Sequence, residues 1–288
     1  MAAIKSYKGF DKNLKCRDFQ YEIGKEYEMD GEIRVCKRGF HACESPFEVF
    51  DHYSMIGSRF CEVEQDGNIS KEDRGTKICS SKIKIKAELK LADMINLGVE
   101  WLKEITSPEK IKTSIKDNSS GNGAKIGSSG DYAKIGSSGD YAQIGSSGDD
   151  AQIGSSGDYA KIGSSGNGAK IGSSGDDAQI GSSGNYAQIG SSGDYAKIGS
   201  SGDDAKIGSS GDGAKIDSTG EGCVIMCAGI NSVAKASKGS WITLSEWSYS
   251  DKKQRYIPVC VKTEFVDGEK IKADTYYKLA GGVFKEIQ

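Results

Sequence analysis

Residues 124–162 read AKIGSSGDYAKIGSSGDYAQIGSSGDDAQIGSSGDYAKI, one nine-residue phrase repeated without interruption. Isoleucine recurs at every ninth position from Ile126 to Ile225. A fixed period of this kind is typical of a solenoid, in which each repeat stacks on the next and together they bury a continuous core. This stretch therefore decides the fold.

Within one repeat, polar and apolar residues alternate, as in the tetrapeptide 132–135, Tyr-Ala-Lys-Ile. A strand with this pattern would place alanine and isoleucine inside and tyrosine and lysine outside. The remaining Gly-Ser-Ser-Gly-Asp has the composition of a turn. Nine residues are too few to close a flat coil around an isoleucine. We therefore expect each rung to contain two repeats, 18 residues. The protein would be mainly β, a parallel β-solenoid with two narrow sheets back to back.

This arrangement explains why the residue before isoleucine runs Lys, Lys, Gln, Gln along the chain. Alternate repeats lie on opposite faces, so each face reads Lys, Gln, Lys, Gln from rung to rung. Rungs lie about 4.8 Å apart, and stacked ammonium groups would repel at that distance. Duplication of a 36-residue segment would produce the same rhythm without any such pressure.

Two further columns flank the turns. The first, which we call the acidic ridge, consists of Asp140, Asp158, Asp176, Asp194 and Asp212, one above another. The second follows the acidic position and carries Tyr132, Tyr141, Tyr159, Tyr186 and Tyr195 among glycine and aspartate. Exposed tyrosine suits protein contacts, but it is also common on exposed strands. We take these ten residues as the candidate protein-binding residues.

The acidic ridge has three interpretations. Aspartate after glycine can be a turn residue that accepts backbone N–H groups, and Asn122, Asn167 and Asn185 replace it without disturbing the period. Stacked carboxylates can also mimic the phosphates of a nucleic acid, although residues 117–221 hold 14 acids against 7 lysines, a charge density below half that of a duplex. Calcium is disfavoured because Ala133 and its equivalents occupy the ligand position of calcium-binding nonapeptides.

Composition restricts the class of protein. The N-terminal MAAIKSYKGF lacks the apolar core of a signal peptide, and the eight cysteines form no C-x-x-C pair, which favours a reducing, cytoplasmic location. No apolar run approaches the roughly 18 residues of a membrane span. We expect no membrane association and no cofactor.

The flanks of the repeat predict three domains. Residues 1–112 read as a small α+β domain with strands or turns at 7–10, 34–43 and 59–67, a short helix after Pro46, and a helix at 91–105 that caps the solenoid. Residues 113–240 hold the solenoid. Residues 241–288, rich in aromatic and β-branched residues with VDGEK and AGG turns, form a β cap.

No motif for catalysis or metal binding stands out. Cys36, His41, Cys43 and His52 do not have the spacing of a zinc site. His41 together with Glu62 and Glu64 on a following strand could form an acid–base pair, or His41 could simply be packed. We expect no metal ion and no catalytic residue.

The chain resembles a group of phage and prophage proteins of unknown function. The shared phrases are KGFDKNLKC (8–16), CKRGFHACESPFEVF (36–50), SSKIKIKAEL (80–89), the SGDxAxI repeats, and a tail like KGSWITLSEW (238–247) with VDGEKIKADTYYKL (266–279). The resemblance implies a viral origin and brings no catalytic residues. Accessory phage proteins of this size often bind and disable a host protein.

The leading hypothesis is therefore a non-enzymatic interaction protein. Its acidic and tyrosine-bearing faces would occupy a host protein that handles nucleic acid, such as a CRISPR or restriction effector, with no direct binding of nucleic acid. A homodimer packed along one face would help to stabilise the rod. The alternatives are a structural spacer or virion component, and an N-terminal domain with a ligand-binding or enzymatic pocket around His41.

Overall fold

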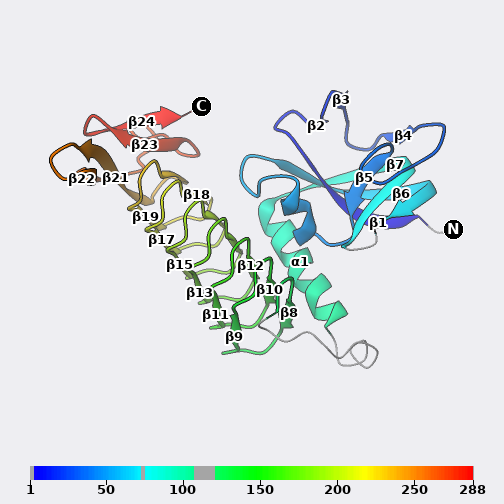
Figure 1. Ribbon diagram of the computed structural model, residues 1–288, viewed down its shortest axis with the longest axis horizontal. Helices are drawn as coiled ribbons and strands as arrows, with labels where there is room; N and C mark the ends of the chain where they lie inside the picture. The colour runs from blue at the N-terminus through cyan, green and yellow to red at the C-terminus, as the bar shows by residue number, and fades with distance from the viewer. Residues whose placement is uncertain (1–2, 73–74, 107–120, 288) are drawn as a thin grey trace. The chain divides into compact units, whose positions relative to one another are not determined.

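The computed structural model describes residues 3–72, 75–106 and 121–287. Packing divides the chain into two compact units, Met1–Trp101 and Leu102–Gln288. Strands dominate both units, as the sequence predicts (Figure 1). The predicted boundaries after residues 112 and 240 stay predictions, and the first falls outside the described residues. Among those residues no helix has the length and apolar character needed to cross a bilayer.

The N-terminal unit is built on an antiparallel sheet whose strands follow the order β4-β7-β5-β1-β6. Because β7 also pairs with β6, the sheet closes on itself. Its core contains Phe10, Val63, Ile83 and Ile85. The elements are β1 (Ile4–Phe10), β2 (Lys15–Cys16), β3 (Phe19–Gln20), β4 (Glu26–Glu28), β5 (Phe40–Cys43), the 3-10 helix η1 (Phe47–Asp51), β6 (Arg59–Lys71) and β7 (Lys77–Leu89).

The predicted helix at 91–105 is confirmed as α1 (Leu91–Ile105). The end of α1 lies against the first repeat strand at Gly127. If Gly127 carried a Cβ, that atom would lie only 2.8 Å from Thr106 Oγ1 and 3.0 Å from the carbonyl carbon of Leu102, so the two backbones are close together here. This close approach fits the predicted role as a cap at the first rung. The helix predicted after Pro46 is the short 3-10 helix η1, and no side chain caps its start.

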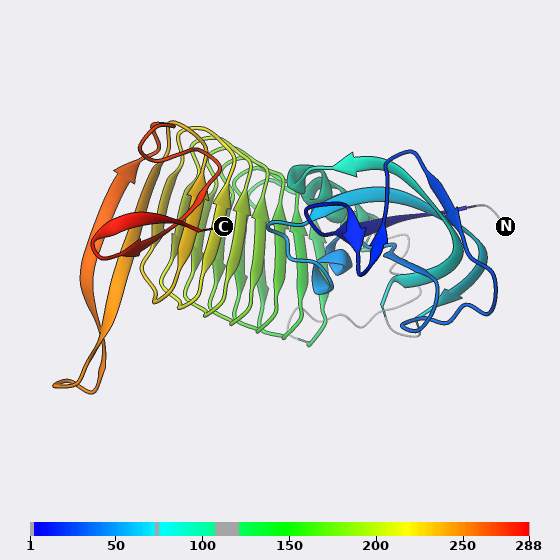
Figure 2. The same ribbon diagram turned by 90° about the horizontal axis from the view of Figure 1, so that it is seen from above.

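The repeats form the predicted solenoid of two parallel sheets (Figure 2). Strands 18 residues apart pair in register, so that Ile144 lies beside Ile162 and Gln143 beside Lys161. One sheet holds β8 (Lys125–Ser128), β10 (Gln143–Ser146), β12 (Lys161–Ser164), β14 (Gln179–Ser182), β16 (Lys197–Ser200), β18 (Lys215–Ser218) and β20 (Val233–Ala236). The other holds β9 (Lys134–Ser137), β11 (Gln152–Ser155), β13 (Lys170–Ser173), β15 (Gln188–Ser191), β17 (Lys206–Ser209) and β19 (Val224–Cys227).

The position of the strand within the repeat differs from the prediction. The strand covers Lys-Ile-Gly-Ser, as in Lys134–Ser137, and not Tyr-Ala-Lys-Ile. Tyr132 instead has φ of 56° and belongs to the turn. Glycine and the first serine, which we assigned to the turn, are strand residues. The serine points inward, and Ser182 is fully buried beside the isoleucine column.

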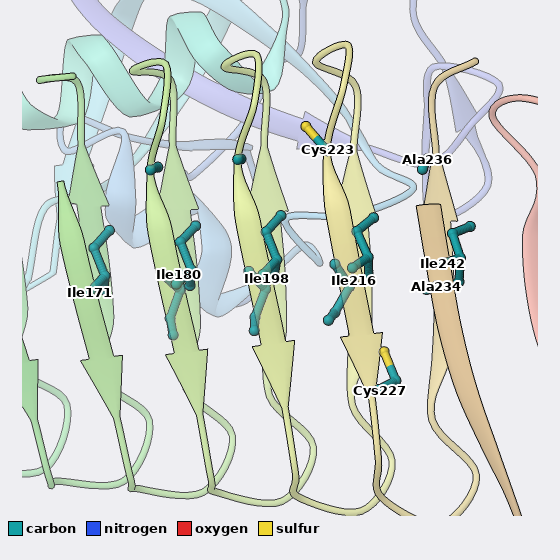
Figure 3. Close-up of a cluster of buried hydrophobic side chains, with 14 of the residues drawn as sticks. Ile171, Ile180, Ile198, Ile216, Cys223, Cys227, Ala234, Ala236 and Ile242 are labelled. Carbon is teal, nitrogen blue, oxygen red and sulfur yellow. The ribbon is translucent and has the colours of Figure 1, made fainter. Parts of the chain in front are cut away.

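The core is otherwise the predicted one. Alanine and isoleucine fill the interior from rung to rung, as with Ala178 and Ile180, both fully buried. Figure 3 shows Ile180, Ile198 and Ile216 in line on one sheet, with Ile171 on the other. Cys223 and Cys227 replace the inward alanine and the inward serine of their repeat, on either side of Ile225. Each buried isoleucine contributes about 1.5 to 3 kcal/mol to folding. The small alanine and serine positions allow the two sheets to lie close together.

The C-terminal segment closes the last rungs. It consists of two hairpins, β21 (Trp241–Ser250) with β22 (Arg255–Phe265), and β23 (Tyr276–Ala280) with β24 (Val283–Ile287). The first hairpin extends one sheet because β21 pairs in parallel with β19, and the second extends the other because β23 pairs with β20. Val266, Ile271 and Tyr277 join the core cluster of the solenoid. The predicted C-terminal β region is confirmed, with the AGG turn between β23 and β24 and VDGEK in the connection between the two hairpins.

Candidate functional site

The acidic ridge is a ladder of hydrogen bonds between rungs. Oδ1 of Asp140 accepts the backbone N–H of Asp158 at 3.0 Å, and Oδ1 of Asp158 accepts that of Asp176 at 2.8 Å. The series continues through Asp194 and Asp212 at 2.8 and 2.7 Å and ends on the N–H of Ile230. Each carboxylate thus satisfies a turn donor that no strand pairing reaches.

The opposite turn edge carries the same ladder with mixed residues. Oδ1 of Asp149 accepts the N–H of Asn167 at 2.7 Å, and Oδ1 of Asn167 accepts that of Asn185 at 2.9 Å. An amide oxygen serves as well as a carboxylate, so the ladder needs an acceptor and not a charge. This geometry favours the structural interpretation of the ridge. The expectation differs from the structure only in the donor. The N–H group that each side chain accepts lies on the next rung and not in the same turn.

The tyrosine column lies beside each ladder, one residue further along the chain. All five tyrosines have φ between 56° and 59°, a region that favours glycine, asparagine and aspartate. Their side chains are exposed, from 46% at Tyr159 to 70% at Tyr132. Other rungs place Gly123, Gly168 or Asp150 at this position with the same backbone. Local structure therefore gives no reason for tyrosine here.

One pair in this column is in contact. The rings of Tyr141 and Tyr159 stack, with centroids 5.0 Å apart and planes 5° apart. Asp177, one rung further, raises the pKa of the Tyr159 hydroxyl by its negative charge, followed by smaller effects of Tyr141 and burial. This turn edge therefore presents flat aromatic surface next to negative charge. Such a surface suits a protein partner with basic and aromatic groups.

His41 lies in the N-terminal unit, at a cavity of about 600 Å³. Its Nε2 accepts the backbone N–H of Cys36 at 2.9 Å, which holds the loop before β5. Burial lowers the pKa of the imidazole, and the positive charges of Lys8 and Lys77 add to this effect. A neutral imidazole with an occupied acceptor nitrogen acts here as a structural anchor.

The structure does not bring His41 to Glu62 or Glu64, which was the acid–base alternative to a packed histidine. Glu62 forms an ion pair with Lys5 at 2.8 Å, and Glu64 forms one with Lys86 at 2.8 Å. Both glutamates lie on β6, whereas β5, which carries His41, pairs with β1 and β7. Neither glutamate lines the cavity. The geometry supplies no acid–base pair at this position.

The cysteines differ sharply in their expected reactivity. Cys36 is exposed, and Lys77 Nζ lies 3.2 Å from its sulfur. Burial raises the pKa of Cys43 and of Cys61 to about 12 and that of Cys79 to about 11. Because the thiolate is the reactive form, iodoacetamide at pH 8 should modify Cys36 first, and Cys43, Cys61 and the equally buried Cys227 last. Peptide mass spectrometry over time measures this order. Equal rates at Cys36 and Cys43 would contradict it.

Comparison with known proteins gives one match, to a family model over the N-terminal part of the chain. No curated protein and no solved structure shows significant similarity to it. Residues 4–97, which cover the β sheet of the N-terminal unit and the first part of α1, match the model of a domain of unknown function, DUF7666.

Proposed function

We propose that the protein is a non-enzymatic interaction protein whose turn edges bind a partner protein through the tyrosine column. The observation that carries the proposal is the conformation of these five residues. A bulky side chain at positive φ costs free energy relative to glycine or asparagine, and each of these rings is at least 46% exposed. A costly and exposed aromatic residue without a local role is typical of a binding surface.

The acidic ridge contributes to the proposal in a smaller way. Its Oδ1 atoms are engaged in the ladder, while the negative charge remains at the edge beside the tyrosines. The ridge therefore favours a partner with a basic surface without requiring one that binds nucleic acid. The resemblance to phage proteins favours a host protein as that partner. Mimicry of a nucleic acid is the stronger version of the same proposal.

The test compares variants that keep the backbone intact. Replacing all five tyrosines with glycine should abolish capture of the partner from host lysate, and circular dichroism should show an unchanged fold, because glycine already occupies this position in other rungs. A matched control replaces the exposed Lys134, Lys170 and Lys206 with glutamine, which their columns already contain. It should capture the same protein as the wild type.

The readout is the set of proteins captured, identified by mass spectrometry at low and moderate salt. Loss with the glycine variant and retention with the lysine control supports the tyrosine surface. Equal capture by all variants would rule it out. A variant with asparagine at Asp140, Asp158, Asp176 and Asp194 separates the two versions of the proposal, since only mimicry requires the charges.

A further inference from the structure

We propose that the cavity of the N-terminal unit is a binding site for a nucleotide, a small anion that carries a flat ring. The cavity measures about 600 Å³, within the range of small-molecule sites. It is bordered by residues of β1, of the hairpin β2–β3, and of the loop before β5. All of its lining residues belong to the N-terminal unit, so the site is independent of the solenoid surface.

The charge of the lining favours an anion. Lys8, Arg17, Lys37 and Lys77 line the cavity, and Asp18 is the one carboxylate among the lining residues. Four basic side chains against one acidic side chain give the lining an excess of positive charge. A concave site with one sign of charge concentrates ligands of the opposite sign.

Among the lining residues, Lys8 argues most directly for a negatively charged ligand. Its side chain comes from β1 and is only 4% exposed. Its Nζ donates to the carbonyl oxygen of His41 at 2.9 Å and lies 3.6 Å from Cys16 Sγ. No carboxylate among residues 3–72, 75–106 and 121–287 lies within ion-pair distance of it. Burial accordingly lowers its pKa.

A buried ammonium group without a counter-ion is costly to a fold. Its contacts with one carbonyl and one sulfur compensate only in part, and the rings of Phe10 and Tyr21, 5.4 and 5.6 Å from Nζ, add a weaker attraction. A phosphate group in the cavity would supply the missing negative charge. The free energy that the uncompensated ammonium group costs in the free protein is recovered when the phosphate binds, and this gain favours binding.

Aromatic residues in the lining provide a contact surface for the flat ring of the ligand. Phe19 lines the cavity and is 46% exposed, unusual for a phenylalanine with so many aromatic neighbours. Its ring packs edge-on against Tyr21 at 4.7 Å and Phe40 at 6.3 Å, and both of these also line the cavity. These contacts fix the ring, and an exposed, fixed ring offers a stacking surface to a flat ligand.

Two residues that line the cavity, Arg17 and Cys36, have positive φ. Arg17 is the first residue of the two-residue loop between β2 and β3 and has φ of 55°. Cys36, held by His41, has φ of 62°. Both conformations favour glycine or asparagine, and arginine at such a position lowers stability. Strained residues that face a cavity are typical of functional sites.

Calorimetric titration of the full-length protein tests the proposal with ADP, adenosine and inorganic pyrophosphate as separate probes. ADP should bind at least ten-fold more tightly than either of the other two, because only ADP presents both charge and ring. Absence of ADP binding up to millimolar concentration, or equal affinity for pyrophosphate and ADP, would overturn the assignment of a nucleotide.

Two variants test the residues. Lys8→Met should weaken ADP binding by at least thirty-fold and leave the melting temperature of the free protein unchanged or higher, since a buried unpaired charge is removed. Arg17→Gly should also weaken ADP binding and raise the melting temperature, because glycine relieves the strain at φ 55°. The matched control is Lys5→Met. Lys5 lies on the same strand, does not line the cavity and forms an ion pair with Glu62, so its replacement should leave ADP binding as in the wild type.

These outcomes separate a ligand site from a structural role. If Lys8 were structural, Lys8→Met would lower the melting temperature. ADP affinity retained in both Lys8→Met and Arg17→Gly would overturn the proposed site. The five-tyrosine variant should bind ADP as the wild type does, so failure of the solenoid proposal and failure of this one are distinguishable.

Discussion

Replacing Gly175 with alanine should destabilise the solenoid by about 3 kcal/mol or more, near the upper end of the cost of overpacking. An ideal Cβ at this position would lie 2.1 Å from the carbonyl oxygen of Gly157 on the preceding rung and 2.4 Å from its carbon. Both atoms are backbone and cannot move aside without separating the rungs. The φ of Gly175 is not in the left-handed region, so the effect is purely steric.

The same repeat contains the control. Gly172 lies in β13, and a Cβ added there would have no atom within 4 Å. Gly172→Ala should change stability by no more than about 0.5 kcal/mol, in the stabilising direction, because glycine costs strand stability through its greater freedom in the unfolded chain. Urea unfolding followed by circular dichroism measures both variants. Equal midpoints would show that the crowding at Gly175 is relieved at little cost.

The contrast between these glycines explains why one repeat keeps both. The column of Gly175 recurs at Gly157, Gly193 and Gly211 with the same 2.0 to 2.1 Å approach. It sets the distance between rungs at the turn. The column of Gly172 is open on its sheet, whereas on the other sheet Gly127 receives the last turn of α1. A single repeat therefore carries glycine for two different reasons.

The stacking of the repeats could be predicted from the sequence because it depends on period alone. Isoleucine at every ninth position and the Lys/Gln rhythm together require two repeats a rung, and the register of Ile144 with Ile162 confirms this. The placement of the strand was wrong for a physical reason. Tyr132 and Lys134 are two residues apart, so alternation alone cannot tell a strand residue from a turn residue with positive φ.

A signal for the correct placement was present in the substitutions. Glycine and aspartate replace tyrosine at some positions of that column, as at Gly168 and Asp150, and both residues tolerate positive φ. For the acidic ridge, asparagine in place of aspartate at Asn122, the first position of the same column, indicated that an acceptor mattered more than charge. The donor could not be seen within one repeat because it lies 18 residues away.

The cavity of the N-terminal unit shows the limit of motif reasoning. His41 was noticed because histidine is rare in this chain, but its imidazole anchors the loop at Cys36. The residues that define the cavity chemically, Lys8, Arg17 and Phe19, belong to no motif. They come together because the β2–β3 hairpin folds over β1. Only the burial of Lys8, the positive φ of Arg17 and the exposed ring of Phe19 make them conspicuous.

Asp176→Ala and Asp176→Asn should have clearly different effects on stability. Oδ1 of Asp176 accepts the N–H of Asp194 at 2.8 Å, and alanine removes that acceptor. The loss should cost about 1 kcal/mol, toward the lower part of the range for an orphaned donor because water reaches this edge. Asparagine keeps the oxygen, as Asn167 does for Asn185 at 2.9 Å, and should leave stability unchanged.

Charge provides a second comparison within the same experiment. Asparagine at Asp140, Asp158, Asp176 and Asp194 should equal or exceed the wild type in stability at low salt, because it retains the ladder and removes repulsion between carboxylates one rung apart. The advantage should shrink as salt screens that repulsion. Urea midpoints at 20 and 500 mM NaCl measure it. If the asparagine variants are as unstable as Asp176→Ala, the carboxylates stabilise the solenoid through their charge, and the ladder does not explain the acidic ridge.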